Sequence, residues 1–474
     1  GAFSTCCCDY CKDRFQREFG RELPNFEDKE FWGDTSGNPT TWGNYNNPAF
    51  RDWVQLKVNS VSDHIKMVKS ILGDRPLMTC CSATGPMHLN GLALNLERFM
   101  DNLDLVMLEN CGMSVHTVEW GKMEAEALIQ KNIALNMGKA PAIALSYSTY
   151  DTSAYMGWSF ARFWGVSNWA STLIGRLSHN PGDIKEIHEL LAPSNNWEDR
   201  YSPLDTDKGE DIYEVRLVNN LLCRENGYRD EEGREHWTKV SAWSKVFIRT
   251  NVGYRFLRYT ELADAKRLMS EDTPIILDNC GCVSDEQYTA IKVYLENGGK
   301  VIMALPFGIK DGKGFIREKP LSEELIEANY PGLVLIDNNI VDECCVAQLI
   351  EKGIIKPRIH QVEGETTWAV RIRKHEDKLV MHILNRAIEA IPHSTLTGAM
   401  HTGNILKDIK ATNNGDKVSY IIDINGIADK WDNLSFMSPE IGSIKRGVVV
   451  ENLGHNKVKV TIDPKNIMLY GIVM

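Results

Sequence analysis

The sequence predicts an α/β protein in three parts: the C-terminal half of a (β/α)8 barrel, a doubly wound α/β domain and a small antiparallel β domain. Three observations predict this. Apolar strands alternate with helices early in the chain, a strand, helix, Gly-Gly, strand unit follows, and short alternating strands between Asn/Gly turns fill the end. The expected boundaries are residues 1–190, 205–350 and 360–474.

Composition narrows the class of protein. The 474 residues are 43% hydrophobic and 25% charged, and no apolar run approaches the ~20 residues of a membrane helix. A net charge of -11 argues against nucleic acid as a partner. The twelve cysteines include adjacent groups rather than the spaced framework of a secreted domain, so we expect a reducing compartment, the cytoplasm.

The first part is expected to begin with a short helix that ends at Gly20, an aromatic-rich loop and a long helix over 49–72. Repeated βα units follow, with strands at 76–81, 103–109 and 140–147 and helices at 94–102 and 119–138. About four such units fit before Pro181, whereas a closed barrel needs eight. The simplest interpretation is a barrel whose first half is missing from this chain.

The second part is expected to contain helices at 210–226 and 237–252, followed by a strand, a helix and a strand at 273–277, 285–297 and 300–305. The latter three form one right-handed crossover of a doubly wound sheet. In the third part, alternating runs predict antiparallel strands at 379–384, 418–422 and 457–462.

A C-x-C-x-x-C run formed by Cys6, Cys8 and Cys11 predicts a metal site, because closely spaced thiolates can share one tetrahedral zinc ion. Three thiolates leave one position open, and either Cys7 fills it or a ligand upstream of Gly1 does. The alternative is a reduced cysteine cluster on a loop. Neither a phosphate-binding nor a dinucleotide-binding glycine motif occurs, so no nucleotide cofactor is expected.

A resemblance to bacterial glycoside hydrolases is carried by the N-terminal motif, which reads Cys6, Cys8, Cys11, Phe15, Gly20, Leu23 and Pro24. The motif is similar to the segment after the fourth barrel strand in hypothetical glycosyl hydrolase family 6 and, more distantly, in the family 42 β-galactosidases. The resemblance implies a glycosidase acting on an oligosaccharide or a polysaccharide side chain, with a structural zinc and a flavodoxin-like trimerisation domain. It also implies a catalytic residue before Gly1, so we expect a fragment.

Glycoside hydrolysis needs two carboxyl groups, and barrels hold them at the carboxyl ends of strands. Glu109 ends the predicted strand 103–109 and is the first catalytic candidate; its alternative role is to form a salt bridge or to bind a substrate hydroxyl. Asp151 is the second. Family 42 enzymes carry their nucleophile on the seventh strand, where this chain has no Glu. A pairing of the fourth and sixth strands, as in some α-glycosidases, would make Glu109 the general acid and place the nucleophile upstream.

Sugars stack on aromatic rings and bind fixed polar groups. Trp158 and Tyr150 are expected to contact ligand in preference to Trp169, because they lie nearest the polar loop. The full set of predicted substrate-binding residues is Asn110, His88, His116, Tyr147, Tyr150, Trp158, Arg162 and Trp164.

Two other functions fit the sequence. A cysteine-dependent amidotransferase or hydrolase would use Cys280 or Cys282, which follow the strand 273–277 but lack the usual nucleophile-elbow pattern. A non-catalytic carbohydrate-binding or assembly protein would use the partial barrel for binding and the middle domain for oligomerisation.

Overall fold

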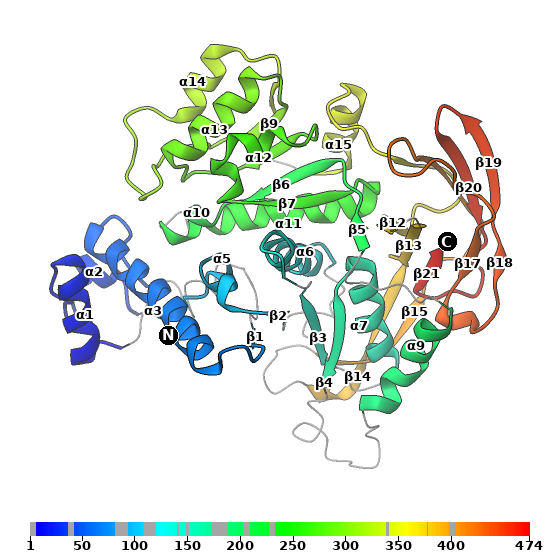
Figure 1. The fold of residues 1–474 in the computed structure, drawn as a ribbon, viewed down its shortest axis with the longest axis horizontal. Coiled ribbons are helices and arrows are strands. Elements are labelled where there is room, and N and C mark those ends of the chain that lie inside the picture. Colours follow the sequence, from blue (N-terminus) through cyan, green and yellow to red (C-terminus); the bar gives the residue numbers. More distant parts are fainter. Residues whose placement is uncertain are drawn as a thin grey trace.

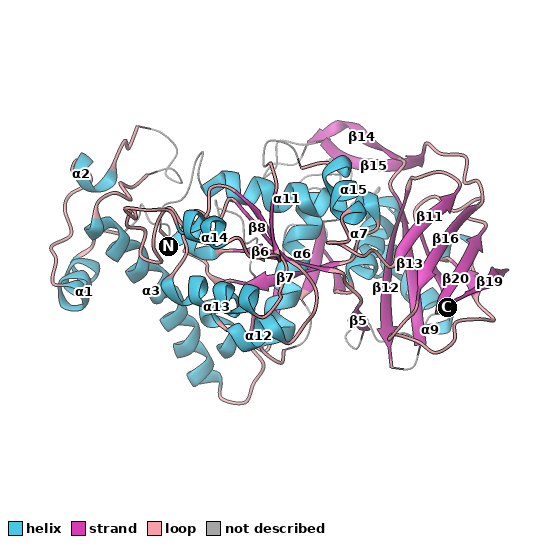
Figure 2. Cartoon of the chain, turned by 90° about the horizontal axis from the view of Figure 1, so that it is seen from above, coloured by secondary structure: helices cyan, strands magenta, loops and turns pink. Residues whose placement is uncertain are grey.

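The computed structural model arranges the chain as an N-terminal helical segment, two parallel sheets covered by helices and an antiparallel β region (Figure 1). From above, α1 to α3 lie at one end of the molecule and the antiparallel strands at the other (Figure 2). The structure describes residues 6–36, 42–80, 93–108, 120–139, 142–147, 151–171, 187–201, 209–226, 233–337, 341–376, 378–397 and 404–474.

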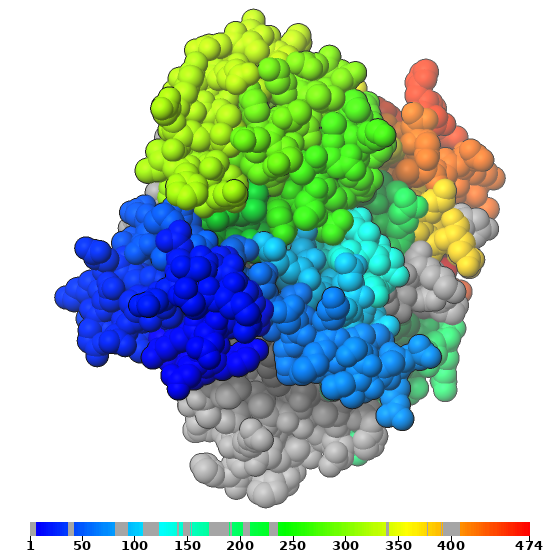
Figure 3. All heavy atoms as spheres, turned by 60° about the vertical axis from the view of Figure 1, so that its left-hand side comes forward, coloured from blue at the N-terminus to red at the C-terminus, as the bar shows by residue number. Residues whose placement is uncertain are grey.

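The N-terminal segment is a small aromatic core. Helix α1 (Asp9–Phe19) ends at Gly20, whose φ of 67° suits a left-handed helix cap, and α3 (Pro48–Leu72) begins after the Asn47 cap. Both limits confirm the sequence predictions. Edge-to-face rings from α1, α2 (Lys29–Trp32) and α3 fill the space between them. In Figure 3 this blue segment lies against the light-green middle domain, where Arg51 donates to the carbonyl of Lys313 at 2.8 Å.

The first parallel sheet has four strands in the order β1-β2-β3-β4. Its strands are β1 (Met78–Cys80), β2 (Leu105–Leu108), β3 (Ile143–Tyr147) and β4 (Ser167–Ser171). Its helices are α5 (Leu96–Phe99), followed by a 3-10 turn at Met100–Asn102, α6 (Trp120–Asn136), α7 (Asp151–Trp164) and α9 (Ile187–Tyr201). The predicted βα repetition is confirmed. Within the described residues the sheet is open, with β1 and β4 as its edges.

The second parallel sheet has five strands in the order β10-β9-β8-β6-β7. This is the flavodoxin-like order, in which the direction of winding reverses beside the first strand. The strands are β6 (Val215–Asn219), β7 (Tyr254–Arg258), β8 (Ile275–Asp278), β9 (Val301–Ala304) and β10 (Leu333–Leu335). The helices are α10 (Leu221–Glu225), α11 (Gly233–Thr250), α12 (Ala265–Met269), α13 (Asp285–Glu296), α14 (Leu321–Ala328) and α15 (Glu343–Glu351). The predicted crossover from β8 through α13 to β9 is confirmed.

The predicted helix over 210–226 is wrong. That segment contains β5 (Gly209–Asp211), β6 and the short helix α10. Strand β6 lies in the middle of the parallel sheet and is buried along its whole length, so it shows no polar and apolar alternation. Arg216 obscures the apolar run further, although its guanidinium is buried and donates to the carbonyls of Leu268 and Thr273.

The C-terminal region confirms the antiparallel prediction. One sheet has the order β18-β17-β21-β13-β12-β5 and includes β12 (Trp368–His375), β13 (Lys378–Asn385), β17 (Ser435–Met437), β18 (Arg446–Gly447) and β21 (Tyr470–Val473). A second sheet comprises β11 (Ile359–Glu363), β16 (Val418–Asp423), β20 (Lys457–Ile462) and β19 (Val449–Gly454). Strands β14 (Ile388–Thr397) and β15 (Asn404–Ala411) pair separately.

A buried ionic network joins the three parts. Asp211 of β5 accepts hydrogen bonds from Lys131 of α6 and from Arg373 of β12, each at 2.7 Å. Glu124 of α6 pairs with Arg371 of β12 and accepts from the hydroxyl of Tyr254 in β7 at 2.8 Å. Because removing one partner of a buried pair leaves the other charge uncompensated, these contacts hold the parts in a fixed arrangement.

Glu97 of α5, which lies beside Arg258 of β7, should make the stability of the protein depend on pH. Burial raises the pKa of Glu97 to about 8, even though Arg258 lies 3.9 Å away and the Thr260 hydroxyl donates at 3.0 Å. The folded state therefore holds a proton that the unfolded chain loses above its ordinary pKa of 4.5. Stability should fall by a few kcal/mol, at about 1.4 kcal/mol per pH unit, as the pH rises through this window towards 8.

We expect the urea midpoint to decrease from pH 5 to pH 8 and Glu97→Gln to flatten that decrease. Asp101→Asn changes an exposed carboxyl nearby and serves as the control. An unchanged pH slope in Glu97→Gln would contradict the assignment.

Candidate active site and cysteine cluster

The carboxyl ends of β1 to β4 lie along one edge of the first sheet. The parallel register aligns Cys80 with Met107, Leu108 with Ala144, and Tyr147 with Ser171. In parallel α/β folds, functional groups gather at this edge because every strand leads into a loop there. The segments that follow these strand ends, 81–92, 109–119, 148–150 and 172–186, lie outside the described residues.

The two faces of the sheet differ in exposure. Val106 and Ala144 are fully buried against the apolar residues of α6 and α7. Alternation along the strands places Met107, Ile143 and Trp169 on the opposite face, where the first two are half-buried and the Trp169 side chain is 42% exposed. This is the face that a closed barrel directs towards its axis. It is therefore partly open here and carries a large aromatic ring.

Five of the predicted site residues belong to the segments that follow these strand ends in the sequence. Glu109, Asn110, His88, His116 and Tyr150 lie outside the described residues. Tyr147 is the last residue of β3 and Asp151 the first of α7, so the backbone brings both to the carboxyl edge.

Trp158, Arg162 and Trp164 instead lie along α7, where they pack against neighbouring elements. The Trp158 ring is 1% exposed and meets Trp197 and Tyr470 edge-on, with centroids 6.1 and 5.4 Å away. The Arg162 guanidinium pairs with Glu198 at 2.6 Å. The Trp164 indole donates to Glu124 at 3.1 Å. These contacts join α7 to α9, α6 and the C-terminal sheet.

The sequence favours Trp158 over Trp169 for contact with ligand. In the structure, Trp169 is the more exposed of the two rings. The pattern that could have identified Trp169 is the alternation Ser167, Trp169, Ser171 in the edge strand β4. The prediction about ligand contact rests on proximity to the polar loop, which does not specify the side of a helix or strand that each ring occupies.

The three N-terminal cysteines converge. Their Sγ atoms all lie within 4.8 Å of one another, with 3.2 Å between Cys6 and Cys8 and 3.5 Å between Cys6 and Cys11. Thiolates on one tetrahedral zinc at about 2.3 Å would be roughly 3.7 Å apart, so the arrangement fits such an ion. Cys7 is outside this group and packs against the aromatic core of the N-terminal segment. Burial raises the pKa of the Cys11 thiol to about 12, so ion binding here would release a proton.

Cys280 and His236 do not form a nucleophile and base pair. Cys280 is fully buried, and its Sγ lies 4.0 Å from Nδ1 of His236. Both ring nitrogens of His236 are already engaged, Nδ1 with the carbonyl of Asp278 and Nε2 with the backbone N–H of Asn220. Burial also lowers the pKa of His236 to about 4. A neutral histidine with both nitrogens occupied cannot serve as the base that a cysteine nucleophile requires.

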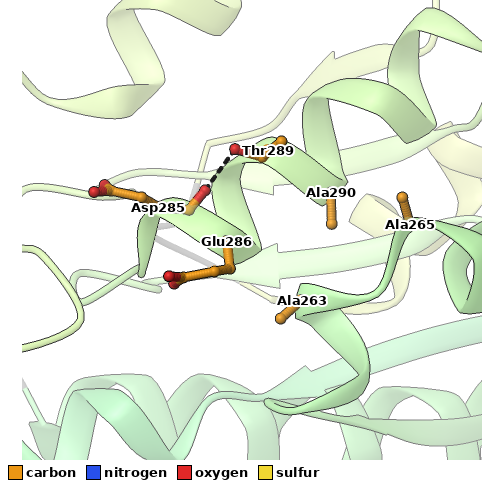
Figure 4. Close-up of a pocket in the computed structure, with 6 residues that line it drawn as sticks. All are labelled: Ala263, Ala265, Asp285, Glu286, Thr289 and Ala290. Atoms are coloured by element: carbon orange, nitrogen blue, oxygen red, sulfur yellow. Dashed lines mark hydrogen bonds between the residues drawn. The ribbon is translucent and has the colours of Figure 1, made fainter.

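A groove of about 660 Å³ lies at the carboxyl ends of β6 to β9, where the order of the second sheet reverses. Its lining includes Leu222, Tyr259, Ser284 and Asp311. An adjoining hollow is floored by alanines and edged by Asp285 and Glu286, the first residues of α13 (Figure 4).

Comparison with solved structures identifies the class of protein that shares this fold. Over 99% of this chain, the structure aligns with a beta-galactosidase from Bacillus circulans sp. alkalophilus, covering 77% of that chain (TM-score 0.64, 10% identity). It aligns equally far with a GH42 beta-galactosidase from G. stearothermophilus, covering 76% of that chain (TM-score 0.62, 12% identity). An alpha-L-fucosidase isoenzyme 2 from Paenibacillus thiaminolyticus also aligns over 99% of this chain and 75% of its own (TM-score 0.57, 10% identity).

No protein-family model and no curated protein matches the sequence. At these identities the likeness is one of fold, and the neighbours that share the fold are glycoside hydrolases. Among the residues that the structure describes, no helix is long and apolar enough to cross a membrane.

Proposed function

We propose that this protein is a glycoside hydrolase that cleaves an O-glycosyl bond in an oligosaccharide or a polysaccharide side chain. The observation that carries the proposal is the partly open face of the first sheet, with Trp169 beside the edge where four strands end. Aligned strand ends supply loop-borne polar groups, and an exposed indole supplies a surface for the C–H face of a sugar. The shared fold with beta-galactosidases and a fucosidase supports this assignment.

Within the proposal, Glu109 donates the proton to the leaving oxygen, because it directly follows Leu108 at the end of β2. Asp151, at the start of α7, is the second carboxyl candidate. Tyr147, Tyr150, Asn110, His88 and His116 would bind sugar hydroxyls from neighbouring loops. A homo-oligomer, a trimer by resemblance, and a cytoplasmic location complete the proposal.

Replacing Glu109 is the direct test. Glu109→Gln should lower kcat by about 10²–10⁴-fold on the best alkyl-linked glycoside of a panel of sugars, because an alkoxide leaving group needs the proton that the amide cannot deliver. Asp104→Asn is the matched control. Asp104 precedes the same strand at its other end, where its carboxylate accepts from Lys69 and from the N–H of Leu77. Equal rates in Glu109→Gln and the wild type would exclude this role.

A carbohydrate-binding protein without turnover is the second candidate. It is favoured by the described strand ends, since Cys80 and Ser171 place no carboxylate at the ends of β1 and β4. Saturable binding of a sugar by calorimetry, with no release of reducing ends, would favour this candidate. Turnover would favour the enzyme.

We also propose that Cys6, Cys8 and Cys11 hold a structural zinc that orders the N-terminal segment. One zinc per chain is expected by elemental analysis, and Cys8→Ser should abolish it and lower the melting temperature of the N-terminal segment. Cys344→Ser, which changes an exposed cysteine on α15, is the control. A metal-free wild type that melts like the variant would contradict the assignment.

A further inference from the structure

Two buried thiols meet at the point where the second sheet reverses its winding. Cys223 lies in α10, after β6, and Cys282 lies in the turn after β8. Both side chains are fully buried and form one apolar cluster, against which Leu222 and Ile309 pack. Their contact brings together two segments that lie 59 positions apart in the chain.

The backbone fixes this contact from both sides. The Asn220 side chain caps α10 by accepting from the N–H of Leu222 and donates to the carbonyl of Cys282 at 2.9 Å. The thiol of Cys223 points to the same carbonyl, 3.8 Å away. On the other side, the backbone N–H of Lys310 donates to the carbonyl of Gly281 at 2.9 Å. These hydrogen bonds fix the position of Cys223 relative to the backbone of Cys282.

Cys223 and Cys280 lie close together in the fold but have different surroundings. Burial opposes ionisation of Cys223, but hydrogen bonds from the side chain and backbone of Cys282, the charge of Arg224 and the N–H of Gly281 lower its pKa. Cys280, two residues before Cys282, has a different environment, since its sulfur faces the carbonyl of Asp278 and the ring of His236. Burial raises the pKa of Cys280. Of Cys223 and Cys280, Cys223 therefore has the lower pKa and is the better nucleophile once an oxidant reaches it.

We propose that Cys223 and Cys282 form a reversible disulfide when the protein meets hydrogen peroxide. The Cys223 thiolate attacks one peroxide oxygen, giving a sulfenic acid and hydroxide, which takes up the proton lost from the thiol to become water. The Cys282 thiol then attacks the Cys223 sulfur, so that the S–S bond forms and a second water leaves. Two thiols are oxidised and one peroxide is reduced.

The groove provides the approach for a small oxidant. Leu222, which covers the thiol pair, also lines the groove, and Ser284, two residues after Cys282, lines it as well. The disulfide would link the two segments beneath the groove. Its formation would therefore change the positions of lining residues such as Leu222 and Ser284.

The full-length chain, reduced and then treated with hydrogen peroxide, tests the proposal. After alkylation of the remaining thiols under denaturing conditions, mass spectrometry should show the Cys223 peptide joined to the peptide that contains Cys282, two hydrogens lighter than the free pair. Dithiothreitol should reverse the link. Cys280→Ser, the matched control in the same turn, should retain the link, and Cys282→Ser should lose it.

The exposed thiol of Cys344, which lies outside the proposed zinc site, reports whether the peroxide was effective. Alkylated Cys223 in a sample whose Cys344 is fully oxidised would overturn the proposal. So would fragment ions from the wild type that place the link on Cys280, and this reading does not depend on whether any variant folds.

Discussion

Replacing Asp211 by Asn should destabilise the protein by about 3–5 kcal/mol, the cost of leaving buried charges unpaired. The Asp211 carboxylate accepts from both Lys131 and Arg373, and each of these side chains is 1% exposed. An amide keeps the shape but loses the charge that compensates the two cations. The expected measurement is a lower urea midpoint, with fluorescence and far-UV circular dichroism changing together.

The control for this change is the neighbouring residue on the same strand. Glu210 is exposed, so Glu210→Gln should leave the midpoint within about 0.5 kcal/mol of the wild type. Double replacement of Asp211 and Arg373 by neutral residues should recover part of the loss, because one uncompensated cation is removed. An Asp211→Asn midpoint equal to that of Glu210→Gln would show that the network carries no stability.

Two tryptophans eleven positions apart, Trp158 and Trp169, should respond in opposite ways. Trp158→Ala should cost about 3–5 kcal/mol of stability, since the ring is buried between Trp197 and Tyr470. Trp169→Ala should cost little stability because the ring is partly exposed in an edge strand. If the open face binds sugar, Trp169→Ala should weaken that binding by about tenfold, or about 1.4 kcal/mol.

The comparison is decisive because each variant serves as the control for the other. Urea midpoints give the first effect, and calorimetric Kd values for the best sugar of the panel give the second. A Trp169→Ala protein with unchanged Kd would move the sugar site away from the open face. A Trp158→Ala protein that keeps its stability would contradict the packing around α7.

Local sequence patterns predicted the helices that begin or end at a capping residue, a proline or a glycine. Gly20 ends α1, Pro48 opens α3, and the Ser284 capping box begins α13 where the sequence placed it. These limits depend on backbone preferences that a few neighbouring residues determine. The same holds for Cys6, Cys8 and Cys11, whose spacing already restricts how far their sulfurs can separate.

Contacts between distant segments could not be predicted in this way. Arg216 is polar, yet its buried guanidinium donates hydrogen bonds to the carbonyls of Leu268 and Thr273. Its charge interrupts the apolar run of β6, and the sequence therefore predicts a helix where the structure has a buried strand. Trp158 and Trp169 are chemically alike, and only the packing of α7 against the C-terminal sheet buries one and leaves the other partly exposed. The meeting of Cys223 and Cys282 likewise depends on the strand order of the second sheet.

The placement of β5 has a consequence for synthesis on the ribosome. β5 ends at residue 211, but the strand that pairs with it, β12, begins at residue 368, beyond the whole second sheet. During translation, Lys131 and Asp211 therefore emerge long before Arg373, and the sheet that contains Asp211 and Arg373 receives its strand β21 later still. A nascent chain stalled before β12 would hold an incomplete ionic network, so the native arrangement of the early part is secured only after β12 has been translated.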